Sequence, residues 1–472
     1  MKTSKRILSI LLAVVMVVLA VPVVYGASTV KSGTFGNGFS WVYDSNHCLT
    51  VKGTGAMPDY SNGLEEPWVE LYYDFLFNHT AVESLIIENG ITHIGNCAFY
   101  LIPVKSVSIP NSVKSIGWQA FSGTMITEVF IPAGVTEIAE QAFNAATLTR
   151  YTVSGSNSAF SAGSDGCLYN KDKTELIDYP MGRLDSYYSI PNTVKKISVL
   201  NIFNALFLTN LFIPKSLIDI PKELFAFNCP KLESVTVDSS NSAFSSDSNG
   251  CLYNKNKSEL ILYPSGKRSS SFSIPSSVES VRNFAFLTAT NLESINIPSS
   301  VKTIGLGCFG QCVNLKKVVL QEGLERIETS AFSACVSLTE ISIPASVSYI
   351  GFDAFVGTGL KSITILNPNC NIDLLVYNTD GTVNRDKKLM HDSFADATFY
   401  GYEGSTAQAY ATEFDHPFIS LGSSPVPIVK PGVPNESEKD DGNQSLGQRI
   451  QNVFNRILEF IRNLIYRLTH IF

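Results

Sequence analysis

The stretch IPSSVKTIGLGCFGQCVNLKKVVL, Ile297 to Leu320, contains the pattern that decides the fold. Its apolar residues, from Val301 through Phe309, return in the same order from Leu324 onward. Along the chain this pattern recurs every 22–24 residues. Such a period is typical of a solenoid, in which each coil buries its apolar face only by stacking on its neighbours. The sequence therefore predicts a stack of coils and not a set of independent globular domains.

Each repeat has two short extended segments. The first, L-x-x-V-x-I-P, alternates apolar and polar residues before a proline, as in Leu338–Pro344. This alternation predicts a strand with one face in the core, and the proline ends the strand where no N–H group is needed. The second, x-S-V-x-x-I-G, returns the chain, and an Ala-Phe pair then places an aromatic ring on the axis. The residue that ends the first strand recurs at Ile87, Ile109, Ile131, Val153, Ile190, Ile213, Val237, Ile274, Ile297, Leu320, Ile343 and Ile365.

Two inserts interrupt the repeat, where the spacing of these strand ends rises to 37 residues. They occupy residues 154–186 and 238–270 and align without gaps at an offset of 84, which indicates that a block of sequence was duplicated. In each insert, C-L-Y-N, a polar turn and E-L-I-x-Y-P predict a β-hairpin. Its paired tyrosines either pack the hairpin onto the solenoid or project as aromatic contact points. They are Tyr169, Tyr179, Tyr253 and Tyr263.

The N-terminal segment predicts an exported protein. Lys2, Lys5 and Arg6 precede an apolar run that ends in small residues. This order is typical of a secretory signal peptide over residues 1–27, and an uncleaved N-terminal anchor is the alternative. In residues 28–80, aromatic residues alternate with polar ones on either side of a turn. We expect a β-hairpin there that caps the open end of the solenoid.

Composition excludes one class of partner. The chain has 35 Lys and Arg against 42 Asp and Glu, a net charge of −7, and removal of the three basic residues of the signal peptide lowers this to −10. Nucleic acid is therefore excluded as a partner, because its phosphates need a basic face. Hydrophobic residues make up 44% of the chain and charged residues 16%, which suffices for a continuous apolar core.

The nine cysteines favour a buried, reduced state. Cys229, Cys312 and Cys335 occupy the same small apolar position of their repeats, three residues before a leucine. We interpret them as small hydrophobic residues, with a disulfide framework as the alternative. Cys308 and Cys312 lack the additional His or Cys partners that a zinc site needs.

No motif in the sequence predicts catalysis. The six histidines are scattered without H-E-x-x-H spacing, and G-x-S-x-G, C-x-x-C and Walker motifs are absent. A solenoid offers open faces more readily than closed pockets. We therefore predict that the protein is not an enzyme, and we assign no catalytic, cofactor-binding or metal-binding residue.

The outward positions of the first strands form the candidate binding surface. Most of them are small or polar, and Phe130, Arg150, Tyr187 and Phe212 are the exception. Aromatic residues and arginine are the types that anchor interfaces. We predict that these four residues contact a partner; an extra packing layer under the first insert is the alternative.

The C-terminal part changes character twice. Residues 391–421 are predicted to form the last coil and cap, and residues 422–444 a Pro-, Ser- and acid-rich linker. Residues 445–472 place apolar residues at helical spacing and contain four arginines against one glutamate, which predicts a basic amphipathic helix. This helix binds a membrane surface, pairs with another helix or a partner's groove, or packs back onto the solenoid. Its candidate residues are Phe454, Arg456, Phe460, Arg462, Leu464 and Arg467.

Taken together, these motifs resemble the BspA-type leucine-rich repeat proteins of bacteria. The resemblance spans residues 32–421 and rests on the repeat skeleton, both inserts, the opening S-G-T-x-G and the terminal FYGYEGSTAQAYA of Phe399–Ala411. It implies a mainly β solenoid, a leucine-rich repeat domain over residues 81–421, in secreted or cell-surface proteins. Some members of this family adhere to host proteins or to other bacteria. It supplies no catalytic or ligand residues to transfer, so it predicts a fold more firmly than a function.

Two functions are compatible with these features. The first is an adhesin-like secreted or cell-surface protein that presents its solenoid face to an extracellular protein or glycan and needs no cofactor. The second is an envelope structural protein or spacer attached through residues 445–472. A hydrolase is the weakest of the three interpretations.

Overall fold

The structure is a computed structural model of the whole chain. It describes residues 29–61, 66–198, 205–221, 229–373, 376–377, 383–384, 393–394 and 396–428. The predicted signal peptide, most of the predicted linker and the predicted C-terminal helix lie outside the described residues. The chain divides into two compact units, unit 1 with residues 1–184 and 197–205 and unit 2 with residues 185–196 and 206–472.

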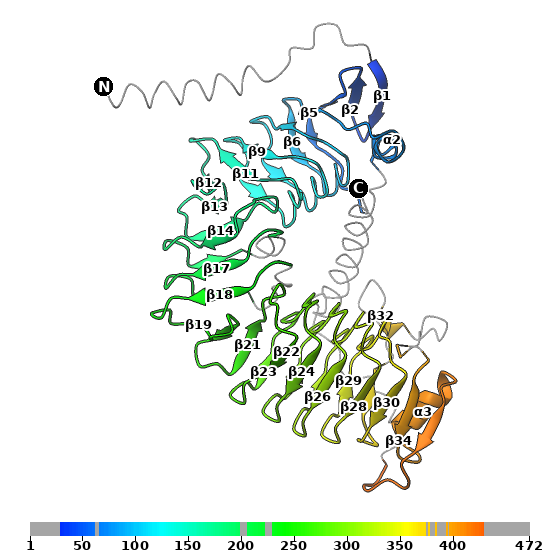
Figure 1. Cartoon of the computed structure of the whole chain (residues 1–472). Helices are drawn as coiled ribbons and strands as arrows, with labels where there is room; N and C mark the ends of the chain where they lie inside the picture. The colour runs from blue at the N-terminus through cyan, green and yellow to red at the C-terminus, as the bar shows by residue number, and fades with distance from the viewer. Residues whose placement is uncertain are drawn as a thin grey trace. The chain divides into compact units, whose positions relative to one another are not determined.

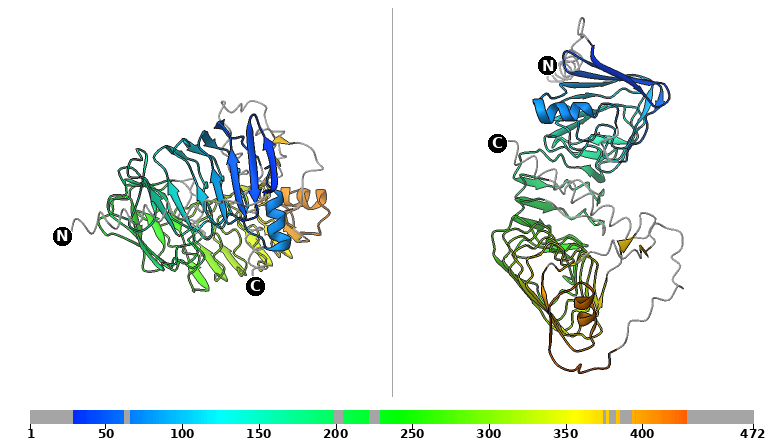
Figure 2. Two further views of the ribbon diagram at one scale, coloured as in Figure 1. Left: turned by 90° about the horizontal axis from the view of Figure 1, so that it is seen from above. Right: turned by 90° about the vertical axis from the view of Figure 1, so that its right-hand side faces the viewer.

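Unit 1 begins with an antiparallel β-meander of β1 (Thr29–Phe35), β2 (Phe39–Asp44) and β3 (Cys48–Lys52). The predicted N-terminal hairpin is thereby confirmed. Strand β3 pairs in parallel with β5 (Ser84–Ile87), so the meander continues directly into the first coil. A helix that the sequence pattern did not predict, α2 (Glu70–Asn78), also belongs to this end of unit 1 (Figures 1 and 2).

Two columns of parallel strands run through the coils of unit 1, as the two extended segments of each repeat predict. The first column contains β5, β7 (Val107–Ser108), β9 (Glu128–Ile131) and β11 (Arg150–Val153). The second column contains β4 (Gly55–Ala56), β6 (Ile91–Ile94), β8 (Ser115–Ile116) and β10 (Glu137–Ile138). Most inward residues of both columns are buried, and outward residues are polar for the most part.

Unit 2 has the same two columns over more coils (Figure 1). The strands of its first column are β15 (Tyr187–Ser189), β17 (Asn210–Ile213), β18 (Ser234–Val237), β22 (Ser271–Ser273), β24 (Ser294–Ile297), β26 (Lys317–Leu320), β28 (Glu340–Ile343), β30 (Ser362–Ile365), β34 (Thr398–Gly401) and β35 (Phe418–Ser420). Those of its second column are β23 (Ser280–Val281), β25 (Thr303–Ile304), β27 (Arg326–Ile327), β29 (Tyr349–Ile350) and β31 (Asn371–Ile372). The short strand β16 (Lys196–Ile197) lies where the chain passes between the units, and β32 (Val376–Tyr377) pairs with β33 (Val383–Asn384).

Both inserts form antiparallel hairpins, as predicted, with one additional strand in front of each. The first contains β12 (Phe160–Ala162), β13 (Leu168–Asn170) and β14 (Glu175–Asp178), and the second contains β19 (Phe244–Ser246), β20 (Leu252–Asn254) and β21 (Glu259–Leu262). In unit 2, β21 pairs in parallel with β23 and so becomes the first member of the second column. The second insert is thus a part of the solenoid wall and not a projecting finger.

Aromatic rings stack along the axis of each unit. In unit 2 the rings of Tyr263, Phe286, Phe309, Phe332 and Phe355 follow one another with centroid separations of 4.8, 4.8, 5.1 and 5.3 Å. In unit 1 the same arrangement joins Trp68, Phe99, Phe121 and Phe143 at 4.9, 5.3 and 5.1 Å. Each phenylalanine follows a small residue of its repeat, Cys308 before Phe309 and alanine before the others. The prediction that each repeat places an aromatic ring on the axis is therefore confirmed in both units, where these rings form a stacked core.

Backbone hydrogen bonds form a third ladder beside these rings. The N–H groups of Phe286, Phe309 and Phe332 each donate to a carbonyl of the following coil at 2.9, 2.7 and 2.7 Å. The turn that makes this possible has positive φ at two residues four positions apart, for example Gly307 at 54° and Gln311 at 58°. A β-carbon at Gly307 would lie 2.4 Å from the Phe284 ring, so this position requires glycine in its coil.

The end of unit 2 is closed by β34, helix α3 (Thr406–Glu413) and β35. Ser405 caps the helix, because its hydroxyl accepts the N–H of Gln408. Buried Tyr410 of α3 packs on Phe394 at 5.1 Å and on Phe399 at 5.4 Å. These rings continue the aromatic stack and cover its last coil.

Truncation of one stacked ring should destabilise unit 2 strongly. We expect Phe309→Ala to lower the free energy of unfolding by about 3–5 kcal/mol, because a fully buried ring leaves a cavity between two others. Chemical denaturation followed by circular dichroism measures this change. Val319→Ala, at a partly exposed position, is the control and should change stability by less than about 0.5 kcal/mol. Equal effects of the two substitutions would contradict the stacked core.

Candidate functional site

In unit 1 the outward face of the first column has one exposed large apolar side chain, in addition to half-buried Ile86, and one arginine. Phe130 on β9 is 45% exposed, and Arg150 on β11 is exposed as well. The strand register pairs Phe130 with Thr152 and Arg150 with Glu128. The two side chains are therefore diagonal neighbours on the same face of the sheet, within reach of one partner group.

In unit 2 the equivalent positions are Tyr187 on β15, which is 58% exposed, and Phe212 on β17, which is half-buried. Tyr187 pairs with Asn210, and Phe212 lies between Ser189 and Thr236 of the neighbouring strands. Tyr187 and Phe212 are again diagonal neighbours on one face. The structure thus groups the four candidate residues into two pairs, one in each unit. That all four contact one partner stays a prediction.

The four insert tyrosines lie in the core, whereas the first-column candidates face outward. Tyr169, Tyr179, Tyr253 and Tyr263 are all buried, with at most 1% of each side chain exposed. Tyr263 stacks on Phe286, and the hydroxyl of Tyr253 donates to Asp247 at 3.1 Å. They offer no surface to a partner, because the insert strands lie in the solenoid wall and turn these rings inward. We therefore remove them from the candidate binding surface and assign them to the core.

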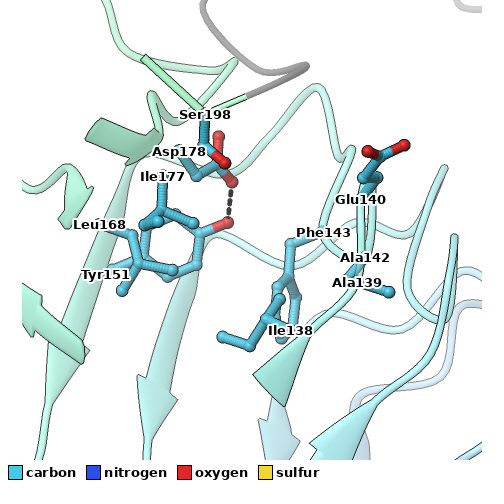
Figure 3. A pocket seen from close by; sticks show the side chains of 10 residues that line it. All are labelled: Ile138, Ala139, Glu140, Ala142, Phe143, Tyr151, Leu168, Ile177, Asp178 and Ser198. Carbon is cyan, nitrogen blue, oxygen red and sulfur yellow. Dashed lines mark hydrogen bonds between the residues drawn. The ribbon is translucent and has the colours of Figure 1, made fainter. Parts of the chain in front are cut away.

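A small cavity of about 40 Å³ lies under the first insert, in unit 1 (Figure 3). Polar and apolar residues both line it; Tyr151 and Asp178 meet there, and the tyrosine hydroxyl donates a hydrogen bond to the carboxylate. Both side chains are buried. Burial, and then the neighbouring Asp178, raise the pKa of Tyr151 above its ordinary value, so the phenol remains a proton donor. The cavity is lined by Ile138, Ala139, Glu140, Ala142, Phe143, Tyr151, Leu168, Ile177, Asp178 and Ser198.

The second copy of the duplicated block replaces the Tyr151–Asp178 pair with apolar residues. At the offset of 84, Tyr151 and Asp178 correspond to Val235 and Leu262, which are both buried. The position of Ser198 corresponds to Arg282, which makes a two-point ion pair with Glu259 at 2.9 and 3.1 Å. The hydrogen-bonded pair is therefore a specific feature of the first copy. Its signal in the sequence was this paired change between two otherwise similar blocks.

No disulfide joins the nine cysteines, and all of them are buried, as predicted. The sulfhydryls of Cys312 and Cys335 donate to backbone carbonyls of the preceding coil, both at 3.1 Å. Burial raises the pKa of Cys335 and of Cys370 to about 12. These thiols are poor nucleophiles at neutral pH, because the reactive thiolate is disfavoured.

The described residues contain no group of three or more His, Cys, Asp or Glu side chains that fits a metal ion. In the same part of the chain, no helix combines the length and the apolar character needed to cross a membrane.

Comparison with known protein families identifies the repeat. The profile described as "BspA type Leucine rich repeat region" matches residues 72–182, 184–267 and 265–380, in six copies. This is more than half of the chain.

The chain belongs to the BspA-type leucine-rich repeat family.

Solved structures of similar fold are bacterial leucine-rich repeat proteins. A leucine-rich cell surface protein of Faecalibacterium prausnitzii is 23% identical, with 81% of this chain and 98% of that chain covered and a TM-score of 0.46. The pneumococcal vaccine antigen PcpA is 19% identical, with coverage of 83% and 99% and a TM-score of 0.44. A leucine-rich repeat protein from Eubacterium ventriosum is 22% identical, with coverage of 70% and 96% and a TM-score of 0.39. No curated protein matches the chain.

The Tyr151–Asp178 pair of this BspA-type repeat can be tested with the residue that the second copy uses. We expect Tyr151→Phe to lower the free energy of unfolding by about 1–2 kcal/mol, because the buried carboxylate loses a donor. The double variant Tyr151→Phe/Asp178→Leu should recover most of this loss. Chemical denaturation measures both, and Tyr73→Phe, at an exposed position of α2, serves as the control. Additive effects of the two substitutions would contradict the proposed coupling.

Proposed function

We propose that this protein is a non-enzymatic, secreted or cell-surface binding protein, adhesin-like, which presents the first-column face of its solenoid to an extracellular protein or glycan. The observation that supports it most directly is the exposure of aromatic residues on an otherwise small and polar face. Phe130 and Tyr187 are 45% and 58% exposed there. Exposed aromatic side chains on a rigid sheet bind partners at low entropic cost, since the strands already hold them in place.

Charge and accessibility favour the same conclusion. Arg150 beside Phe130 adds a group that pairs with carboxylates or stacks on sugar and aromatic faces. The flanking outward residues are short, such as Thr152 in unit 1 and Ser189 in unit 2, so they leave the large side chains accessible. A flat array of this kind suits an extended partner surface more than a small molecule.

Substitution of the exposed aromatics should weaken binding without unfolding the protein. We expect Phe130→Ser/Tyr187→Ser to reduce binding at least tenfold, because truncation of an anchor residue at an interface costs more than about 1.4 kcal/mol. The assay measures saturable binding to arrays of host matrix proteins and bacterial envelope glycans. Val319→Ser, at the same strand position in another coil, is the matched control. Loss of binding in the control alone, or no saturable partner on either array, would refute the proposal.

A second function is supported by the sequence of the C-terminal segment. Residues 445–472 reverse the charge of the rest of the chain and have the spacing of an amphipathic helix. A protein attached through this segment would act as an envelope spacer, with the solenoid as its extended part.

Cell fractionation distinguishes this second function. We expect deletion of residues 445–472 to move the protein from the cell-associated fraction into the medium if the segment is the anchor. The full chain in the same cells is the reference, and the Phe130→Ser/Tyr187→Ser variant, which changes only the solenoid face, is the control. An unchanged distribution after the deletion would exclude anchoring by this route.

A further inference from the structure

We propose that the basic tail of the same chain, residues 445–472, docks on an apolar face at the C-terminal end of unit 2. We call this surface the terminal face and define it by Tyr400, Tyr402, Ile419 and Leu421. The interaction does not depend on the binding function proposed above, because it uses the last two strands of the first column, away from Tyr187 and Phe212, and a partner within the chain.

The strand register places these side chains together. Strands β34 and β35 are parallel neighbours, and Tyr400 pairs with Ile419. The ladder continues, because the N–H group of Leu421 donates to Gly401 at 2.8 Å. Alternate residues of a strand share a face, so Leu421 lies beside Ile419 and on the side of Tyr400. The opposite side is occupied by Phe399, which packs inward on Tyr410.

The terminal face exposes large apolar side chains to solvent. Ile419 is 47% and Leu421 is 42% exposed. The chain then turns and runs on past Asn369, whose side-chain amide donates to Pro427 at 3.0 Å. Thirteen large hydrophobic residues are exposed in the described part of the chain, and four of them fall within residues 419–428. Such a concentration marks a contact site, whereas single exposed hydrophobic residues are ordinary.

The charge at this end selects a basic occupant. Residues 396–428 contain four acidic residues and no lysine or arginine. Glu403 borders the terminal face directly, because its carboxylate accepts the hydroxyl of Ser420 at 3.2 Å. Residues 445–472 contain four arginines and one glutamate, so the tail combines an apolar stripe with the complementary charge. Arginine pairs well with carboxylates at the rim of an apolar contact.

The connection is short enough to favour the chain's own tail. The described residues end at Ile428, seven positions after Leu421 of the terminal face, and 16 residues separate Ile428 from Ser445. A coil of 16 residues spans about 20–25 Å on average. The effective concentration of a segment so tethered is on the order of millimolar, well above that of a second copy in dilute solution. The same stripe cannot contact the terminal face and a membrane at once.

Reciprocal substitutions in the full chain test the docking. A tail variant, Ile457→Glu/Ile461→Glu/Leu464→Glu, leaves the solenoid sequence unchanged. We expect hydrogen exchange of the amides in residues 417–428 to be at least fivefold faster in this variant than in the wild type. A face variant, Ile419→Glu/Leu421→Glu, should in turn make Arg456 and Arg462 at least fivefold more sensitive to trypsin. Val336→Glu, an exposed position elsewhere in unit 2, should change neither rate.

Three results would overturn the proposal. Equal exchange of residues 417–428 in the wild type and the tail variant would show that the terminal face is uncovered. Protection that grows over a tenfold increase in protein concentration would assign the tail to a second copy. Protection of Arg456 and Arg462 only after addition of vesicles of phosphatidylglycerol and phosphatidylcholine would assign it to a lipid surface. Concentration-independent protection without vesicles, lost in both variants, supports docking within the chain.

Discussion

The stacking of one aromatic ring per coil is the constraint on which the rest of this structure depends. Centroids along the axis of unit 2 lie 4.8–5.3 Å apart from Tyr263 to Phe355, close to the spacing of about 4.8 Å between hydrogen-bonded strands. Rings and strands therefore advance by nearly the same step. A coil that failed to supply a flat ring at this position would lose packing with both neighbours and would also disturb the backbone ladder beside it.

This constraint explains how the inserts are accommodated. The second insert lengthens its coil, yet β21 joins the second column and Tyr263 takes the place that phenylalanine has elsewhere. The additional residues form the antiparallel strands β19 and β20, which pair beside β21 at the start of the second column. A tyrosine is suited to this position, since its ring stacks like phenylalanine. In the same hairpin, the hydroxyl of Tyr253 reaches the turn carboxylate of Asp247.

The periodic part of the fold was predictable from the sequence because it depends on local spacing. The two strand columns, the stacked phenylalanines and the buried cysteines all follow from apolar residues that return every 22–24 positions. The direction of the insert tyrosines was not predictable, because alternation in a hairpin does not reveal which face meets the wall. Helix α2 was missed since its nine residues show only a weak apolar stripe. The Tyr151–Asp178 pair joins residues 27 positions apart, a distance that no local pattern encodes.

The division between inward and outward residues also decides where function can reside. Inward positions are restricted by the ring stack and by the close approach of neighbouring coils, as at Gly307. Outward positions of the strands face solvent and have no such packing restriction, so short polar residues are sufficient there. Phe130 and Tyr187 expose apolar area there that the fold does not need, and each exposed aromatic raises the tendency to associate. Packing within the described residues leaves these side chains exposed, and this exposure is the reason that we propose contact with another molecule at this face.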